Sequence, residues 1–271
     1  MKENQLTQKL IIKCIGLINT LGYTKIKKSL FKKDIITDIG QLNKVLCKYD
    51  KHTYLREIVS NSEGKKVKED KFPIIIQKKE GVLIKVFTIN SSNYEKFQYK
   101  NYNSGTSIGN RVMEIVNLIK KATEEHSKII IDLRNCGGGD IRVFFDAFGE
   151  LIGTGLLFYA KENNGKAIYC IRNKTGKIKY TSVKPKLIRK APKINDVKIL
   201  VGSSTASSAE FLAMILKDSI NAKIIGGKTA GYLTLTDEKL ILLENKKYIL
   251  SVTISKNLYD SSERKYNGYI K

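Results

Sequence analysis

Apolar residues follow one pattern before residue 50 and another after residue 80. In residues 1–49 they recur at helical spacing, and a second stripe of this kind runs through residues 34–46. From residue 80 onward, short continuous apolar runs alternate with segments whose apolar residues recur every three or four positions. The first pattern predicts a small helical unit, and the second predicts alternating strands and helices.

Two of the apolar runs, KIIIDL at residues 128–133 and VKILVG at residues 197–202, show no polar alternation. Such runs are typical of strands that are covered on both faces. Helical patterns occupy residues 107–125, 140–153 and 209–220. Strands joined through helices in this way form right-handed βαβ crossovers. We therefore expect an α/β fold with a parallel or mixed sheet covered by helices.

The patterns divide the chain into three expected parts. Residues 1–53 are the N-terminal helical unit, residues 54–79 a β-rich cap or lid, and residues 80–271 the α/β core. The cap segment is polar and lysine-rich, with one strand-like run, FPIII. Near the end of the core, residues 239–255 predict a β-hairpin that turns at ENKK.

The chain is strongly basic, with 49 Lys and Arg against 26 Asp and Glu and a formal net charge of +23. Such a charge permits binding to nucleic acid, to an anionic membrane or to an acidic substrate. The lysines are spread along the chain, and aromatic residues do not alternate with a basic run. We therefore favour a generally lysine-rich surface over a nucleic-acid-binding site.

Neither the cysteines nor the N-terminus indicates a cofactor or export. The four cysteines have no metal-site spacing and the chain has two histidines, so we expect free thiols, no metal and no cofactor. The N-terminal stretch has no signal-peptide design, and no apolar run approaches the roughly 20 residues that span a bilayer. As written, the sequence indicates a soluble, cytoplasmic chain without an anchor, although a trimmed sequence would look the same.

A glycine turn follows one of the predicted buried strands. DLRNCGGGD, at residues 132–140, lies between that strand and a predicted helix. Ligands of parallel sheets bind beyond the carboxyl ends of the strands, and the amides of a glycine turn can point at an anion. The G-x-G-x-x-G pattern of dinucleotide sites is absent. A tight strand-to-helix turn without a ligand is the alternative interpretation.

A second unusual stretch is SSTASSAE at residues 203–210, where a helix is predicted to begin. Capping that helix is one role for these hydroxyls. Another is nucleophilic attack, because the amides and dipole of a helix start stabilise an oxyanion. A serine nucleophile needs a base. His126 has the setting of an exposed linker residue, whereas His52 follows the helical unit and is either a candidate base or an ordinary surface histidine.

Three segments in this order and spacing, KIIIDLRNCGGG, ILVGSSTASSAEFLAMIL and AKIIGGKTAG, resemble the S41 serine peptidases, which include the tail-specific proteases. The resemblance extends from about residue 80 to the end. In tail-specific proteases the nucleophile is the middle serine of a Ser-Ala-Ser-Ala-Ser-Glu-like stretch, and matching its glutamate to Glu210 implies Ser207. The lysine base of that branch would fall at Tyr232. Tyrosine, with a pKa of about 10, is a poor base at neutral pH.

Another S41 branch pairs its serine with a histidine from an Asp-x-His-Ser/Thr-like segment, which YDKHT at residues 49–53 matches. The nisin resistance proteins of this branch carry Thr-Ala-Ser-Ser-Ala-Glu, which TASSAE at residues 205–210 also matches. They lack a PDZ insert, for which residues 54–79 are too few. The resemblance therefore implies Ser207 as nucleophile and His52 as general base. It also implies an oxyanion hole of backbone N–H groups: Gly138, favoured over Gly137 and Gly139, and Ser208.

The expected function is hydrolysis of peptide bonds in a peptide or in the C-terminal region of a protein, with lantibiotic peptides as a candidate substrate. A +23 enzyme steers a cationic lantibiotic poorly, and the nisin resistance proteins carry a membrane anchor and act outside the cell. Two alternatives stay open. One is a catalytically inactive S41-fold protein that binds a peptide, and the other is a basic nucleic-acid-binding protein. The sequence does not indicate the oligomeric state.

Overall fold

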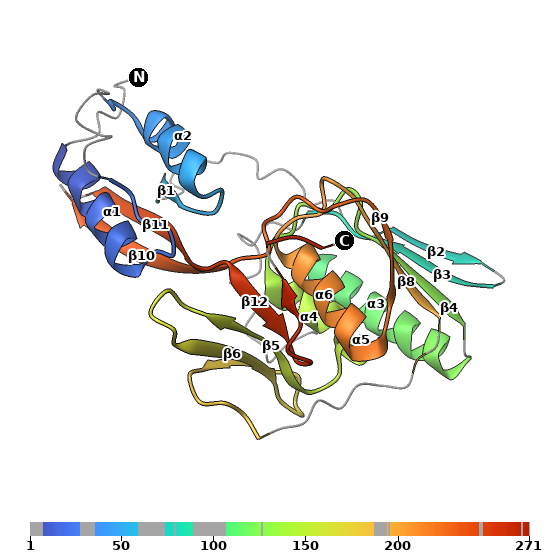
Figure 1. Cartoon of the computed structure of the whole chain (residues 1–271). Helices are drawn as coiled ribbons and strands as arrows, with labels where there is room; N and C mark the ends of the chain where they lie inside the picture. Colours follow the sequence, from blue (N-terminus) through green and yellow to red (C-terminus); the bar gives the residue numbers. More distant parts are fainter. Residues whose placement is uncertain are drawn as a thin grey trace. The chain divides into compact units, whose positions relative to one another are not determined.

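The computed structural model describes residues 8–27, 36–58, 74–78, 80–88, 107–125, 127–186, 194, 196–243, 246–266 and 268–270. Within these residues it contains six helices and three sheets (Figure 1), which confirms the predicted α/β class. The chain forms two compact units. Unit 1 comprises Met1–Val67, Ala160–Lys166 and Thr234–Asn257, and unit 2 comprises Lys68–Tyr159, Ala167–Leu233 and Leu258–Lys271.

Unit 2 is built on a five-stranded sheet in the order β2-β3-β4-β8-β9. Its strands are β2 (Ile74–Lys78), β3 (Gly81–Lys85), β4 (Lys128–Asp132), β8 (Val197–Val201) and β9 (Lys223–Gly226). Strands β3, β4, β8 and β9 are parallel neighbours, and β2 is antiparallel to β3. The predicted parallel core is therefore confirmed. Residues 74–78, within the expected cap segment, form the antiparallel edge strand of this sheet.

Four helices of unit 2 lie in the crossovers of this sheet: α3 (Ser107–Glu124), α4 (Ile141–Ala147), α5 (Gly149–Ile152) and α6 (Ser208–Ile220). The single helix predicted over residues 140–153 is two helices, which divide at Phe148 and end at Gly153. Helix α6 begins at Ser208, within the serine stretch, and its residues from Ser208 to Leu216 are all buried. The sequence therefore places the serines at the start of a helix that is fixed in the core.

A second five-stranded sheet has the order β13-β12-β5-β6-β7. Its strands are β5 (Gly155–Lys161), β6 (Ala167–Arg172), β7 (Ile178–Thr181), β12 (Asn257–Asp260) and β13 (Lys265–Tyr266). Phe158 of β5 packs against Phe211 of α6, with ring centroids 4.9 Å apart. This contact joins the second sheet to the helix that begins at the serine stretch.

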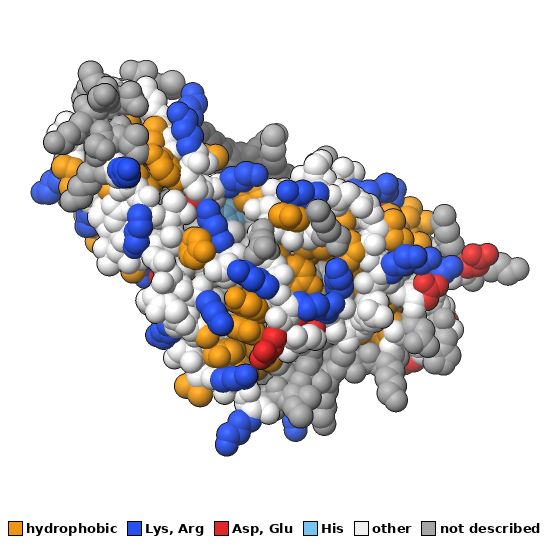
Figure 2. Space-filling model, viewed as in Figure 1, with side chains coloured by type: hydrophobic (Ala, Val, Ile, Leu, Met, Phe, Trp, Pro, Cys, Tyr) orange, Lys and Arg blue, Asp and Glu red, His pale blue; other side chains and the backbone are white. Residues whose placement is uncertain are grey.

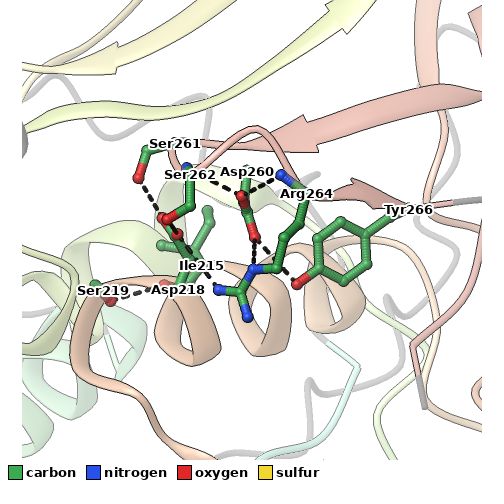
Figure 3. Close-up of polar contacts among 8 residues, drawn as sticks. All are labelled: Ile215, Asp218, Ser219, Asp260, Ser261, Ser262, Arg264 and Tyr266. Carbon is green, nitrogen blue, oxygen red and sulfur yellow. Dashed lines mark hydrogen bonds and ion pairs between the residues drawn. The ribbon is translucent and has the colours of Figure 1, made fainter.

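The C-terminal end of α6 is fastened to the β12–β13 hairpin by a polar cluster (Figure 3). Arg264 Nε donates to Asp260 Oδ2 at 2.8 Å, and the Tyr266 hydroxyl donates to the same oxygen at 3.3 Å. Arg264 also pairs with Asp218 of α6 at 3.5 Å. The hydroxyls of Ser261 and Ser262 donate to Asp218 as well. The cluster thus anchors the far end of α6.

Unit 1 contains α1 (Gln8–Leu21), α2 (Ile39–Tyr49) and a three-stranded antiparallel sheet in the order β1-β11-β10. The strands are β1 (Tyr54–Glu57), β10 (Leu235–Leu243) and β11 (Lys246–Ser255). The predicted hairpin is confirmed by the pairing of β10 with β11, and its tip at residues 244–245 lies outside the described residues. The predicted N-terminal helices therefore pack on strands that come from the other end of the chain.

The core of unit 1 is apolar. Leu42 and Leu46 of α2 and Cys14 of α1 are fully buried in one cluster with Leu250 and Val252 of β11.

No helix in the described part of the chain is long and apolar enough to cross a membrane. Figure 2 shows Lys and Arg side chains dispersed over the visible face among polar and apolar ones. The positive charge of the chain is thus distributed on this face.

Candidate active site

Two loops meet at the carboxyl ends of β4 and β8, where the sequence predicted a ligand site. Thr205 Oγ1 donates to the carbonyl oxygen of Leu133 at 2.8 Å, and the N–H of Ala206 donates to the carbonyl of Cys136 at 3.1 Å. The Ser208 hydroxyl donates to the carbonyl of Gly139 at 2.7 Å. These bonds hold the serine stretch against the glycine turn.

Gly138 makes the closest approach between the two loops. Its φ is +93°, a conformation that L residues with a side chain rarely adopt. A Cβ atom at this position would lie 2.7 Å from the Ala206 carbonyl oxygen and 2.8 Å from Ser207 Cβ. Glycine is therefore required here both by backbone conformation and by the nearness of Ser207.

Ser207 has a strained backbone, with φ 53° and ψ −123°. Non-glycine residues in sparsely populated conformations of this kind cost about 1–3 kcal/mol and cluster at functional sites. A nucleophilic serine on a sharp strand-to-helix turn is a known case, because the turn presents its hydroxyl away from the backbone. Ser203 and Ser204 are exposed, and Ser208 is buried. Ser207 is thus the serine of the stretch whose backbone is distorted.

The buried Glu210 carboxylate holds this turn to the loop that follows β9. Its oxygens accept the N–H groups of Ser207 at 2.9 Å, Gly231 at 3.0 Å and Tyr232 at 2.8 Å, and the hydroxyl of Thr229 at 2.5 Å. Burial raises the pKa of Glu210, while these four donors oppose that rise. A carboxylate suits this setting because it only accepts hydrogen bonds. Glu210 set the register of the predicted nucleophile, but its hydrogen bonds to the loop after β9 were not predicted from the sequence.

The loop after β9 contains Lys228 and Tyr232. The ammonium of Lys228 lies 3.9 Å from the centre of the Tyr269 ring, a cation–π contact. The C-terminal segment fixes the same loop, since Ile270 N–H donates to Thr229 Oγ1 at 2.8 Å and Leu233 N–H donates to the Gly268 carbonyl at 3.2 Å. These hydrogen bonds of the C-terminal segment were not predicted from the sequence.

The four backbone amides expected to form the oxyanion hole differ in their surroundings. Gly137 N–H donates to Thr88 Oγ1 at 2.8 Å. Gly138 N–H bonds to the thiol of Cys136, whose pKa burial raises to about 11. Ser208 is the first residue of α6, where amides have no intrahelical acceptor, and none of the described residues accepts its N–H. For Gly139 the structure records the carbonyl contact with Ser208.

His52 lies in unit 1, just after α2, and its ring contacts Thr234. The Nδ1 atom is 2.5 Å from Thr234 Oγ1. Burial lowers the pKa of His52 to about 4, although the nearby Asp50 carboxylate opposes this. The imidazole is therefore neutral at pH 7. Thr234 was not predicted from the sequence, because it is 182 residues away from His52 and carries no motif.

Asp50 supports the backbone at His52 and not its ring. Its Oδ1 accepts the His52 backbone N–H at 2.8 Å and also the Thr253 hydroxyl. Its Oδ2 pairs with Lys256 at 3.0 Å. Burial alone would raise the pKa of Asp50, but the Thr253 hydroxyl and Lys256 bring it below its usual value. The other histidine, His126, lies outside the described residues.

Within the described ranges, no group of three or more His, Cys, Asp or Glu side chains is arranged to hold a metal ion. Ser207 and the glycine turn are brought together in unit 2. His52 and Thr234 are brought together in unit 1.

Comparisons with known proteins agree with this architecture. The fold is similar to a lipoprotein from Streptococcus agalactiae, with a TM-score of 0.65 and 18% identity over 96% of this chain and 88% of that one. It is also similar to a Parabacteroides merdae ATCC 43184 protein described as a candidate peptidase, with a TM-score of 0.52 and 14% identity over 96% and 86% of the two chains. A search of curated proteins returned no match. The sequence model of peptidase family S41 matches residues 93–270, more than half of the chain, and the chain therefore belongs to this family.

Proposed function

We propose that this chain is a serine peptidase in which Ser207 is the nucleophile and His52 is the general base. The observation that carries the proposal is the backbone of Ser207, strained at the start of α6 and placed against Gly138. The register set by Glu210 in TASSAE points to the same serine. Sequence and backbone geometry thus support one assignment independently.

In the proposed reaction, His52 Nε2 removes the proton from Ser207 Oγ as this oxygen attacks the scissile carbonyl carbon. The tetrahedral intermediate collapses when the imidazolium returns the proton to the leaving amine, which breaks the C–N bond and leaves an acyl-enzyme. Water then attacks the ester with His52 again as base. The carboxyl product leaves and Ser207 regains its proton.

The negative oxygen of the intermediate needs backbone donors. Among the four predicted amides, Ser208 N–H is the best supported, because none of the described residues accepts it and it adjoins the nucleophile. We assign Gly138 as the second donor because of its position against Ser207, with its N–H leaving the Cys136 thiol for the charged oxygen. Gly139 ranks next. Gly137 ranks last because Thr88 takes its N–H.

The pairing of His52 with Ser207 is supported by the match of YDKHT and TASSAE to the same S41 branch. Within unit 2, Tyr232 N–H bonds to Glu210, which also holds the Ser207 N–H. Within unit 1, Thr234 contacts the His52 ring.

We further propose that the chain belongs to the branch that includes the nisin resistance proteins, on the strength of YDKHT and TASSAE. The proposed substrate is an extended peptide or an unstructured protein C-terminus. Lantibiotic peptides are one class to test, and the net charge of +23 argues against a strongly cationic substrate.

A serine-reactive phosphonate probe tests the assignment. Labelling is expected at Ser207, mapped by mass spectrometry, and should be lost in Ser207→Ala and strongly reduced in His52→Ala. Ser203→Ala, Ser204→Ala and Lys228→Ala are the matched controls, and each should label like the unmodified chain. Labelling that survives Ser207→Ala, or that is lost in Lys228→Ala with the fold intact, would contradict the proposal.

Tyr232 favours a second candidate function, since it occupies the position of the lysine base in tail-specific proteases. A catalytically inactive S41-fold protein that holds a peptide fits this substitution. Such a protein would bind peptides without hydrolysing them and would not react with the phosphonate. Peptide binding measured by calorimetry, together with the labelling result, separates the two functions.

A further inference from the structure

We infer that Thr234 is the positioning residue of the catalytic histidine, and that its hydroxyl accepts the Nδ1–H of the imidazole tautomer in which Nε2 is free of a proton. The inference rests on the proposed function, because it concerns the base of that reaction. It goes beyond the Ser207–His52 pair by naming the group that prepares His52 for catalysis.

The contact between the two side chains is short and specific. Thr234 Oγ1 lies 2.5 Å from His52 Nδ1. One nitrogen of a neutral imidazole donates and the other accepts. When Nδ1–H donates to Thr234, Nε2 keeps a lone pair and can accept the proton of Ser207. In the opposite tautomer Nε2 carries a proton and cannot act as a base.

The acidic residue next to His52 cannot fulfil this role. Asp50 Oδ1 is occupied by the His52 backbone N–H and by Thr253, and Oδ2 pairs with Lys256. Its charge still acts on the imidazole from a distance, and the charge of Lys51 acts in the opposite sense. Thr234 Oγ1, by contrast, lies at hydrogen-bonding distance from the ring itself.

A hydroxyl differs from a carboxylate in what it does to the imidazolium. A carboxylate at Nδ1 orients the ring and also stabilises its charged form. A neutral hydroxyl orients the ring with little charge stabilisation. This matches a buried histidine that stays neutral over a wide pH range. Thr234 thus orients the ring, whereas burial and nearby charges set the pKa of the ring.

The tautomer can be measured without any turnover. The chain has two histidines, so a long-range ¹H–¹⁵N spectrum contains two imidazole patterns, and His126→Gln assigns them. In Ser207→Ala, which keeps the site inactive, we expect the His52 signals of the Nδ1–H tautomer. Adding Thr234→Val should shift them toward the Nε2–H form, and adding Thr234→Ser should not.

Kinetics provide the second readout. Thr234→Val should lower kcat on the order of 10- to 100-fold with a small change in KM, because it misplaces the base and leaves the substrate contacts. Thr234→Ser should restore most of the rate. The matched control is Thr236→Val, at an exposed position of β10 two residues further along the chain, which should behave like the unmodified chain.

The outcomes separate this inference from the proposed function. Suppose Ser207→Ala and His52→Ala are inactive while Thr234→Val keeps full kcat and an unchanged His52 spectrum. The dyad then stands and Thr234 has no positioning role. Conversely, an active His52→Ala variant overturns the proposed function itself. If Thr234→Val unfolds the chain, Thr234→Ser, which keeps the hydroxyl, and Thr234→Cys, which replaces it by a weakly hydrogen-bonding thiol, test the same point, because only the thiol variant should lose rate.

Discussion

The buried carboxylate of Glu210 accepts the backbone N–H of Ser207 at 2.9 Å, one helical turn earlier in the chain. This bond secures the residue with the strained φ of 53° at the start of α6. The same carboxylate accepts the N–H groups of Gly231 and Tyr232. The conformation of the proposed nucleophile therefore depends on a charge that lies three residues away and is shielded from water.

Replacing this carboxylate by an amide should weaken both the fold and the activity. In Glu210→Gln one oxygen becomes an NH₂ group, which faces N–H donors and leaves them unpaired. The expected loss of unfolding free energy is about 1–3 kcal/mol, with a larger fall in kcat than in affinity. Urea denaturation and steady-state kinetics measure both. Glu124→Gln, at an exposed position of α3, is the control and should change neither quantity.

The role of Gly138 can be separated from the general requirement for glycine in turns. Gly138→Ala and Gly165→Ala both place a side chain at positive φ, at +93° and +84°, and each should cost about 1–2 kcal/mol of stability. A Cβ at Gly138 would also press on Ser207, whereas no atom lies within 4 Å of a Cβ at Gly165. Only Gly138→Ala should therefore abolish activity. Equal rates in the two variants would contradict the placement of Gly138 beside the nucleophile.

Sequence patterns predicted the parallel sheet well because strands buried on both faces leave continuous apolar runs. KIIIDL and VKILVG became β4 and β8, and the serine stretch between β8 and α6 lies where a crossover places it. The proposed assignment of Ser207 rests on the match of Glu210 to the family pattern, and the two residues belong to one local turn. Local relationships of this kind are encoded within a few residues.

Long-range relationships could not be predicted in this way. Thr234 and His52 are 182 residues apart, and only the pairing of β1 with β11 and of β11 with β10 brings their segments together. The packing of β10 and β11 on the N-terminal helices was missed for the same reason. A hairpin pattern indicates which two strands pair but carries no information about the helices that cover them.

Asp→Asn substitutions in two different ion pairs should lower the free energy of unfolding by unequal amounts. One pair belongs to the polar cluster at the end of α6. Asp260 is fully buried and binds Arg264 and Tyr266 (Figure 3). Asp237 and Lys239 form a partly exposed pair at 2.6 Å. Asp260→Asn should lower the free energy of unfolding by about 1–3 kcal/mol, whereas Asp237→Asn should change it by less than about 1 kcal/mol. Urea denaturation of the two variants measures the difference, and equal losses would contradict the clamping role of the cluster.

The pH dependence of activity should report the burial of His52. The ordinary pKa of a histidine side chain is about 6.5, and burial lowers the pKa of His52 to about 4. The base acts in its neutral form, so kcat/KM should rise as the pH increases through about 4 and should be level by pH 6. The rise in kcat/KM is the acid limb of the pH profile. On an uncharged peptide substrate this limb reports a group of the enzyme. The residual activity of His52→Gln should lack the limb, and a limb that persists there would assign it to another group.

The free energy of unfolding should also depend on the ionisation of His52, and it should decrease as the pH falls. Between pH 6.5 and about 4 the unfolded chain binds a proton at His52 that the folded chain excludes. Proton binding therefore stabilises the unfolded state relative to the folded state as the pH falls through this window, and the free energy of unfolding decreases. His52→Gln should remove this part of the acid destabilisation, seen as a smaller loss of urea midpoint between pH 7 and pH 4. An unchanged loss would show that His52 is equally protonated in both states, and the acid limb of kcat/KM would then have to come from a different residue.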